Sequence, residues 1–281
     1  MADITAIILT RNEETHLRDC IMSIKPIVRR VVVVDSYSED KTTEIAESLG
    51  AEVYKHEFYN HSKQYKYAVN IAQVKTKWIL KIDADERLTK DSADELEMLC
   101  NYNDNTDVSG IIIKFYQIFM GRVLKHGENC PWTKLSVYKT GLADIEDKNV
   151  DEHIRVFSGR VIKTKKCSIH DFYKGLNFYT AKSNWYSTRE AMDYFSNNEY
   201  ADSVNIKNWI KIHIYYRLPT FLRSWMYYIY ILYFKLGILD GREGRIYAFL
   251  HAYWYRFLVD AKIYEHIKTG IPFEPTGALD Q

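Results

Sequence analysis

The feature that most constrains the fold is an alternation of two hydrophobic periodicities over the first hundred residues. Short β-rich runs alternate with segments that carry apolar residues at helical spacing, such as Leu17, Cys20, Ile21 and Ile24. The β-rich runs are Ile4–Leu9, Val31–Asp35, Glu52–His56 and Trp78–Ile82. Because the second run is apolar without interruption from Val31 to Val34, it is typical of a strand buried on both faces. The alternation predicts a Rossmann-like, mostly parallel α/β sheet flanked by helices.

Composition excludes several classes of protein. The chain has 281 residues, of which 47% are hydrophobic and 27% charged, so it is long enough for one large domain or for a domain with a helical appendage. The net charge of +1 gives no reason to expect attraction to a phosphate backbone, and we expect no nucleic-acid partner. The four cysteines form no C-x-x-C pair, which favours reduced, mostly buried thiols. Since the chain opens on a strand-like run without a charged leader, we expect a cytoplasmic protein.

Glycines are missing where two common nucleotide sites would need them. Dinucleotide-binding and P-loop enzymes place glycines directly after the first strand, where the phosphates meet a helix N-terminus. The first glycine of this chain is Gly50. A dehydrogenase or a P-loop enzyme is therefore disfavoured.

Carboxylates follow the predicted strands instead. The fourth strand runs into Asp83-Ala84-Asp85-Glu86, and residues two apart in extended backbone point to the same side. Asp83 and Asp85 would then converge at the edge where such sheets bind ligands. Hard carboxylate oxygens suit Mg²⁺ or Mn²⁺, which would relieve the repulsion between the two charges. The alternative is a helix N-terminus, where acidic residues are also favoured, because Thr89 to Cys100 has a helical pattern.

Asp35 ends the second predicted strand. A carboxylate at this position can accept a hydrogen bond from a uracil N–H or a ribose hydroxyl. Thr10, Arg11 and Glu13, after the first strand, would form the other wall of the same pocket. The cluster that follows Asp35 is also typical of a turn and a helix cap.

Taken together, these motifs resemble the inverting family 2 glycosyltransferases with the GT-A fold, especially small bacterial members that act on lipopolysaccharide core or other surface glycans. The resemblance extends over about the first 100 residues and then thins. It rests on Ile7 to Glu14, Val34 to Thr42, Ser62-Lys63-Gln64, Ile82 to Glu86, Val150 to His153, Ile169-His170 and Gly241-x-x-Gly244. It implies a GT-A catalytic domain over 1–172, with a nucleotide-sugar half (1–100) and an acceptor half (101–172), followed by a helical region over 173–281.

The resemblance also implies roles for individual residues. Thr10, Arg11, Glu13 and Asp35 would hold the nucleoside of a sugar nucleotide, usually UDP, with Lys63 near the donor. Asp83 would contact ribose or metal, Asp85 would bind Mn²⁺ or Mg²⁺, and His170 would be a third metal or diphosphate contact or, alternatively, a histidine at a strand end. Glu152 would be the general base, preferred over its neighbour Asp151 because alternate residues on a strand point oppositely. Trp132 would either stack on an acceptor sugar or belong to the core.

The chain beyond Asp171 is aromatic and helical in pattern. Residues 204–239 contain five basic side chains and no acidic one. Phe221 to Leu239 is interrupted by Arg223 and Lys235, so it falls short of the ~20 apolar residues of a spanning helix. The segment resembles an interfacial belt for the cytoplasmic face of the inner membrane, while a bundle that packs on the catalytic domain, binds acceptor or joins two subunits stays open. The belt would comprise Lys207, Trp209, Ile210, Lys211, Ile212, Tyr215, Tyr216, Arg217, Phe221, Leu222, Arg223, Trp225, Met226 and Tyr230.

These observations predict a metal-dependent inverting glycosyltransferase that moves a hexose from a nucleotide sugar, with UDP as the expected nucleotide, to a glycan or lipid-linked glycan. Two alternatives remain. A nucleotidyltransferase also uses carboxylates and Mg²⁺ at a parallel sheet, but it generally needs a glycine-rich or basic loop after the first strand. A non-catalytic nucleotide-sugar-binding or membrane-scaffold protein would keep its function after Glu152→Gln.

Overall fold

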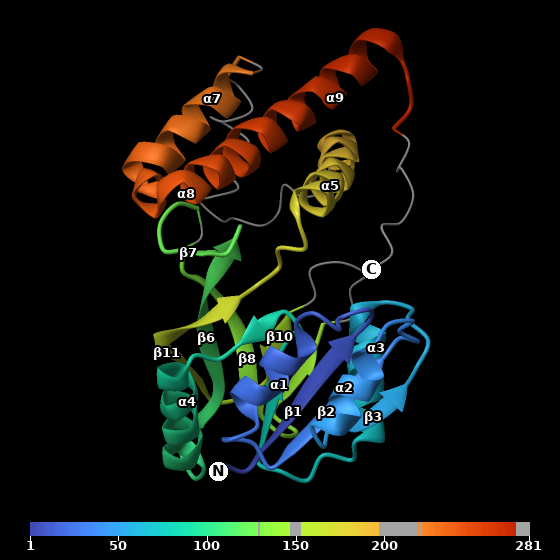
Figure 1. Ribbon diagram of the computed structural model, residues 1–281, viewed down its shortest axis with the longest axis vertical. Coiled ribbons are helices and arrows are strands. Elements are labelled where there is room, and N and C mark those ends of the chain that lie inside the picture. Colours follow the sequence, from blue (N-terminus) through green and yellow to red (C-terminus); the bar gives the residue numbers. More distant parts are fainter. Residues whose placement is uncertain (129, 147–152, 197–217, 220, 274–281) are drawn as a thin grey trace. The chain divides into compact units, whose positions relative to one another are not determined.

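The computed structural model describes residues 1–128, 130–146, 153–196, 218–219 and 221–273 (Figure 1). The chain divides into two compact units. The first, the sheet unit, contains residues 1–118 and 131–172. The second, the helical unit, contains residues 119–130 and 173–281. Each is described by itself below.

The sheet unit is a mixed α/β structure, and all four strands predicted in the first hundred residues are present. The order of the main sheet is β3-β2-β1-β4-β8-β6-β11-β5. The first four strands in this order pair in parallel, as the apolar runs predicted. They are β1 (Ile4–Thr10), β2 (Arg30–Asp35), β3 (Glu52–Lys55) and β4 (Trp78–Lys81).

The rest of the sheet is mixed. Strand β8 pairs antiparallel with both β4 and β6, β6 pairs parallel with β11, and β5 closes the edge antiparallel to β11. A separate two-stranded sheet pairs β9 with β10. The bounds are β5 (Glu86–Arg87), β6 (Val108–Phe119), β8 (Trp132–Lys139), β9 (Ala143–Ile145), β10 (Ile154–Val156) and β11 (Arg160–His170).

Helices cover both faces of the sheet, and the alternation of β1 shows why. Ile4, Ala6 and Ile8 pack with apolar residues of α1 (Leu17–Ile24), α2 (Thr42–Ser48) and α4 (Lys90–Asn103), which lie on the same face (Figure 1). Ile7 points to the opposite face, where α3 (His61–Ile71) and the β9–β10 pair pack. The predicted helix after Thr89 is α4, and the Thr89 side chain caps it by accepting a hydrogen bond from the Ser92 N–H.

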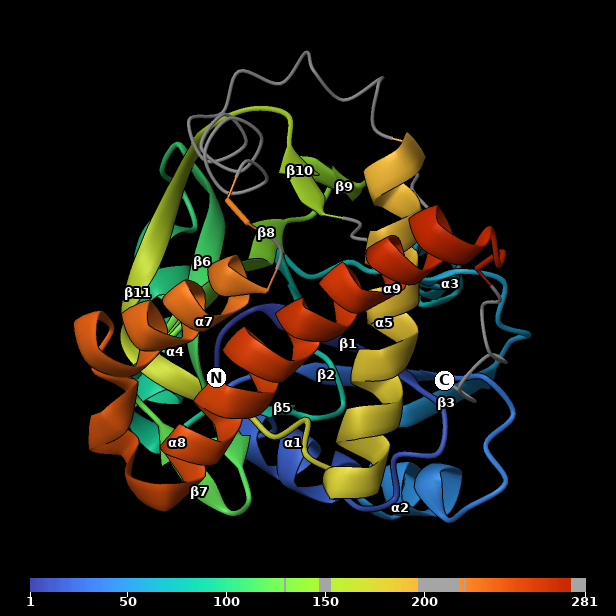
Figure 2. The same cartoon turned by 90° about the horizontal axis from the view of Figure 1, so that it is seen from above.

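The described residues of the helical unit form the short strand β7 (Arg122–Leu124) and three long helical runs. Helix α5 (Leu176–Ser196) packs against α9 (Tyr255–Thr269), which crosses it in Figure 2. Helix α7 (Leu222–Ile229) continues into the π-helical η3 (Tyr230–Phe234). After η4 (Gly237–Asp240), helix α8 (Gly241–Ala248) continues through the π-helical η5 (Phe249–Trp254) into α9. The helical region that the sequence predicted is therefore present in the described part of 173–281.

Close packing explains the Gly241-x-x-Gly244 segment. A Cβ atom at Gly244 would lie 2.4 Å from the Cβ of Asp240 and 2.8 Å from the carbonyl oxygen of Gly237. Gly241 has a φ of +76°, a backbone conformation that residues with a side chain rarely adopt. The absence of side chains at these glycines lets the backbone pack closely against Asp240, which is buried. The Asp240 carboxylate accepts hydrogen bonds from the backbone N–H groups of Lys125 and His126, at 2.9 and 2.8 Å.

Candidate functional site

The carboxyl ends of β1, β2 and β4 lie side by side in the sheet. Strand β1 is central, paired in parallel with β2 on one side and β4 on the other. Its last residue, Thr10, is directly opposite Asp35, the last residue of β2. Asp83 follows two residues after the end of β4. The edge at which parallel sheets bind ligands therefore carries the predicted polar residues.

Two loops at this edge are joined by hydrogen bonds. The buried carboxylate of Asp35 accepts from the Thr10 hydroxyl at 2.9 Å and from the Ser38 backbone N–H at 2.8 Å. The loop after β1 also donates to the loop after β2, from the Asn12 N–H to Ser38 Oγ and from the Glu13 N–H to Thr42 Oγ1, both at 2.8 Å. Asp35 is 0% exposed, so in this conformation it organises the loops rather than presenting its carboxylate to solvent.

Arg11 and Lys63 are the exposed cations among the predicted donor residues. In the described ranges Arg11 has no hydrogen-bond partner, whereas the Lys63 ammonium lies 3.6 Å from the centre of the Tyr59 ring. The next residue, Gln64, is buried and donates to Ser36 Oγ at 3.0 Å, which ties α3 to the loop after β2. Both cations are thus carried on segments fixed at the edge of the sheet.

The segment after β4 is a turn, which corrects the expectation of extended backbone. The Glu86 N–H donates to the Asp83 carbonyl at 2.9 Å, and the Asp83 N–H donates to Glu86 Oε2 at 3.0 Å. The two carboxylates are therefore brought near each other by a turn and not by strand alternation, and burial and, more weakly, the charge of Asp83 act to raise the pKa of Asp85. Asp83 binds the ammonium of Lys134 at 2.6 Å, while Asp85 lies beside His170.

Lys134 forms an ion cluster with buried Glu86 and with Asp83, whose side chain is about half exposed. Its Nζ donates to Glu86 Oε1 at 2.7 Å as well as to Asp83, and the Glu86 side chain is fully buried. Burial raises the pKa of Glu86 to about 7, against the opposing effect of Lys134. Burial also acts to raise the pKa of Asp83, but the charges of Lys134 and Lys81 outweigh it and lower that pKa. Lys134 itself remains charged, because the two carboxylates outweigh burial and raise its pKa.

Asp85 and His170 form a second pair. His170 Nε2 lies 3.2 Å from Asp85 Oδ2, and about a quarter of each side chain is exposed. The strand β5 brings them together, because Glu86 pairs with His170 across the β5–β11 ladder. Burial acts to raise the pKa of Asp85, and the hydrogen bond with His170 lowers it overall. Burial acts to lower the pKa of His170, and the hydrogen bond with Asp85 raises it overall.

Two buried ring nitrogens beside this pair lack a hydrogen-bond partner among the described residues. They are His170 Nδ1 and Trp132 Nε1, and the two rings meet edge-on with centroids 5.3 Å apart. Trp132 is half-buried and stacks on Phe115 at 5.0 Å, so it has both a core contact and an unused donor. Buried polar atoms without partners are uncommon in folded proteins and are explained here if a ligand supplies the partner.

The donor atoms present fit a divalent cation. Asp85 offers carboxylate oxygens and His170 an imidazole nitrogen, which is a combination that Mn²⁺ accepts. Asp83, the third predicted ligand, contacts Lys134 instead. In the ranges that the structure describes, no three His, Cys, Asp or Glu side chains are already grouped as a metal site. Diphosphate oxygens would have to complete the coordination of a metal on Asp85 and His170.

Glu152 and its neighbour Asp151 lie outside the described residues, as does the part of the predicted aromatic belt from Lys207 to Arg217. His153, directly after Glu152, precedes β10 and its carbonyl accepts from the Glu146 N–H at 2.9 Å.

Sequence reasoning missed Lys134 and Glu86 as parts of the site. The antiparallel register of β4 and β8 pairs Leu80 with Val137, and continuing it by three residues places Asp83 opposite Lys134. The available signal was a lysine two residues after Trp132, on the same face of a strand. That signal has meaning only once the pairing of β4 with β8 is known.

Comparison with known proteins identifies the family. The family model described as "Glycosyl transferase family 2" matches residues 5–168, which is more than half of the chain. The chain belongs to glycosyl transferase family 2. The matched range includes β2 to β4 and most of β1 and β11. It contains all the residues of the ion clusters described above except His170.

Individual relatives and solved structures differ in how much of their sequence and length they share with this chain. An uncharacterized glycosyltransferase of Rickettsia bellii is 29% identical over 280 residues, covering 93% of this chain and 86% of the relative. A glucosyl-3-phosphoglycerate synthase from Mycobacterium tuberculosis, solved with Mn²⁺, UDP and glucosyl-3-phosphoglycerate, has a TM-score of 0.33 and 20% identity, covering 41% of this chain and 44% of that one. S. aureus TarS 1-349 has a TM-score of 0.44 and 14% identity, covering 98% and 93%.

Proposed function

We propose that this family 2 glycosyltransferase transfers a hexose from a UDP-sugar, with a divalent cation, to a surface-glycan acceptor such as lipopolysaccharide core, and that it inverts the anomeric configuration. The observation that carries the proposal is the group formed by Asp85, His170 and the two unpartnered ring nitrogens, at the ligand-binding edge of a family 2 sheet. Family membership supports sugar transfer over nucleotidyl transfer.

The donor nucleoside would bind between the loops after β1 and β2. Asp35 and Thr10 hold these loops together, and the exposed guanidinium of Arg11 and ammonium of Lys63 are available for phosphate oxygens. Glu13 would complete the wall next to the base. The buried position of Asp35 implies that binding a uracil or ribose requires Ser38 to release one of its two hydrogen bonds to that carboxylate.

The diphosphate would lie toward Asp85 and His170, which would hold Mn²⁺ or Mg²⁺. When bound, the metal neutralises the charge that develops on the departing diphosphate. Lys134 offsets part of the negative charge of Asp83 and Glu86, so that the negative field around the donor phosphates is reduced. The Trp132 N–H has no hydrogen-bond partner among the described side chains. It would donate to an oxygen of the sugar nucleotide or of the acceptor glycan.

The proton of the acceptor hydroxyl would pass to Glu152 as that hydroxyl attacks the anomeric carbon opposite the leaving group. This role comes from the family resemblance, and Asp151 is the alternative base. General base catalysis by a carboxylate typically accelerates a reaction about 10²–10⁴-fold.

Turnover of candidate donors tests this proposal. The purified chain is incubated with UDP-glucose, UDP-galactose or UDP-N-acetylglucosamine and Mn²⁺, with water as a surrogate acceptor, and UDP release is measured. We expect release from one of these sugars, and Glu152→Gln should slow it at least about 100-fold while UDP binding is retained. Glu47→Gln, on the exposed side of α2, is the matched control and should have the wild-type rate.

Two results would contradict the proposal. Wild-type turnover in Glu152→Gln and in Asp151→Asn would exclude both carboxylates as the base. UDP binding without turnover of any UDP-, GDP- or CMP-sugar, with surface-glycan acceptors present, would support a non-catalytic nucleotide-sugar-binding protein instead.

A further inference from the structure

Helix α7 in the helical unit has its polar residues inside and its apolar residues outside. Arg223 and Ser224 are 6% and 0% exposed, and both donate to the carboxylate of Asp260 on α9. Leu222 and Trp225, on the outer side, are 46% and 53% exposed. A helix on the surface of a soluble protein normally has the opposite arrangement. The exposed face of α7 is therefore suited to an environment less polar than water.

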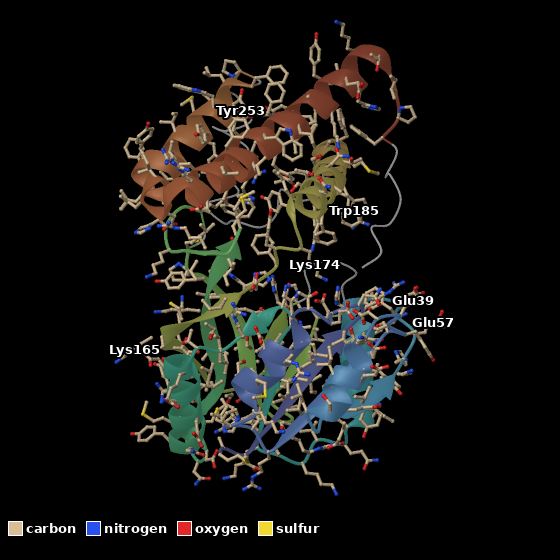
Figure 3. All side chains as sticks on the ribbon, viewed as in Figure 1. Glu39, Glu57, Lys165, Lys174, Trp185 and Tyr253 are labelled. Atoms are coloured by element: carbon tan, nitrogen blue, oxygen red, sulfur yellow. The ribbon has the colours of Figure 1, made fainter. Side chains whose placement is uncertain are left out.

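The exposed apolar residues continue beyond α7. We call the following set the apolar surface: Leu222, Trp225, Met226, Tyr230, Tyr233, Phe234, Leu236, Leu239, Ile246 and Phe249. Its members on α7 and η3 recur at helical spacing, and η3 and α8 are joined by a buried cluster that includes Ile231 and Ala248. Tyr253 of η5, labelled in Figure 3, has its ring 6.2 Å from that of Tyr228 and 5.4 Å from that of Phe249.

The aromatic part of this surface alone is large. Trp225, Tyr230, Tyr233 and Phe234 are 44–75% exposed. With roughly 150–250 Å² for each aromatic side chain, these four leave about 340–560 Å² in contact with water. That area falls in the range of the largest apolar patch on a typical monomeric protein, and such patches are often functional.

The charges around the apolar surface are positive. Lys235, Arg242 and Arg245 are exposed. In the described part of 218–256, the two acidic residues are Asp240, which is buried and binds His126, and Glu243, which is partly buried and lies 3.6 Å from Arg122. An apolar, aromatic surface whose exposed charged residues, in the described part of 218–256, are lysine and arginine is complementary to a layer of anionic lipid headgroups.

Two other occupants fit less well. In a two-fold symmetric dimer the apolar surface would pack against the same surface of a second copy of the chain. The exposed cations at its border would then face like charges. Among the described residues, no helix combines the length and the apolar character needed to cross a bilayer. The α7–η3 run from Leu222 to Phe234 is short and carries several tyrosines and a tryptophan, which favour the membrane–water interface.

We propose that the apolar surface binds the interfacial layer of an anionic bilayer, with its aromatic side chains among the headgroups and with Lys235, Arg242 and Arg245 on lipid phosphates. This docking does not depend on the donor site. It would bring the enzyme to a lipid-linked acceptor if the proposed function holds.

Flotation with lipid vesicles tests the inference on the full chain. The protein is mixed with vesicles of phosphatidylcholine alone or with 30% phosphatidylglycerol, and the bound fraction is measured over a range of lipid concentrations. We expect binding to the anionic vesicles to be at least tenfold tighter. Trp225→Ser with Phe234→Ser should abolish it, whereas Met98→Ser with Tyr102→Ser, two equally exposed apolar residues on α4, should not change it.

A charge variant separates electrostatic from apolar binding. Arg242→Gln with Arg245→Gln should weaken binding to the anionic vesicles about thirty-fold and leave any binding to phosphatidylcholine alone unchanged. The thermal midpoint and the UDP-induced shift should stay at wild-type values in all these variants. A normal UDP shift without vesicle binding would overturn the docking while leaving the proposed function intact.

The opposite outcome is equally clear. If the wild-type chain binds neither kind of vesicle and forms a dimer by sedimentation that Trp225→Ser with Phe234→Ser dissociates, the apolar surface is a subunit interface and the inference is wrong.

Discussion

Replacing Lys134 by methionine should destabilise the sheet unit through the buried carboxylate of Glu86. The substitution keeps the length and apolar stem of the side chain but removes the ammonium that binds Glu86 Oε1 at 2.7 Å. Removing one partner of a buried ion pair costs about 3–5 kcal/mol. The lower end applies here, because the Lys134 side chain is 19% exposed and Glu86, whose pKa burial raises to about 7, can take up a proton. For a unit of this size, about 3 kcal/mol lowers the melting midpoint by about 6–12 °C.

Thermal unfolding of the metal-free chain at pH 7, followed by circular dichroism, measures this effect. Lys166→Met is the matched control, because Lys166 and its partner Asp91 are both more than half exposed and an exposed pair contributes only about 0–1 kcal/mol. Lys134→Met combined with Glu86→Gln should recover most of the loss, because no buried charge then remains at position 86. A change of ~1 kcal/mol in the free energy of unfolding shifts the melting midpoint by ~2–4 °C. If Lys134→Met melts within about 2 °C of the Lys166→Met control, the ion cluster does not stabilise the fold as argued.

Two further predictions concern the helical unit. Asp260→Ala removes the buried carboxylate that binds Arg223 and should cost about 3–5 kcal/mol in urea unfolding, most of it regained in Arg223→Met with Asp260→Leu; a loss below about 1 kcal/mol would contradict the burial argument. Burial acts to raise the pKa of Glu128, but the hydrogen bond and charge of His251 outweigh it and lower that pKa to about 2. Since this folded pKa is below the ordinary value of 4.5, the stabilisation is present above pH 4.5 and is lost as the pH falls toward 2. Wild type should therefore exceed Glu128→Gln by about 3 kcal/mol at pH 6, with the difference gone near pH 2; a difference independent of pH would show that the carboxylate is not stabilised in this way.

The fold of the first hundred residues was predictable because its signals are local. Val31 to Val34 and the spacing of Leu17, Cys20 and Ile21 are set by short-range periodicity, and the structure has the strand and the helix at those places. The polar residues at the strand ends could be located for the same reason, since parallel strands share one ligand-binding edge.

Contacts between distant segments could not be predicted. Lys134 reaches Asp83 only through the antiparallel pairing of β8 with β4, which joins residues about fifty positions apart. Arg223 shows the same limit: its sequence neighbours place it in a basic, aromatic belt, but the structure buries it against Asp260 on a later helix. The turn at 83–86 also depends on Glu86 being buried, which the local pattern of acidic residues does not reveal.

The most direct test of the proposed donor site is the thermal midpoint of the chain with UDP, in Mn²⁺ and in chelator. A ligand that binds only the folded state stabilises it by ~2.7 kcal/mol at a hundredfold excess over its dissociation constant, or about 5–11 °C here. We predict that UDP raises the midpoint only with Mn²⁺, that GDP, CMP and ADP do so less, and that Asp85→Asn abolishes the rise while Asp94→Asn, at an exposed aspartate of α4, retains it. A UDP shift that persists in chelator and in Asp85→Asn, or no shift with any nucleotide, would contradict a metal-assisted nucleotide-sugar site at this edge of the sheet.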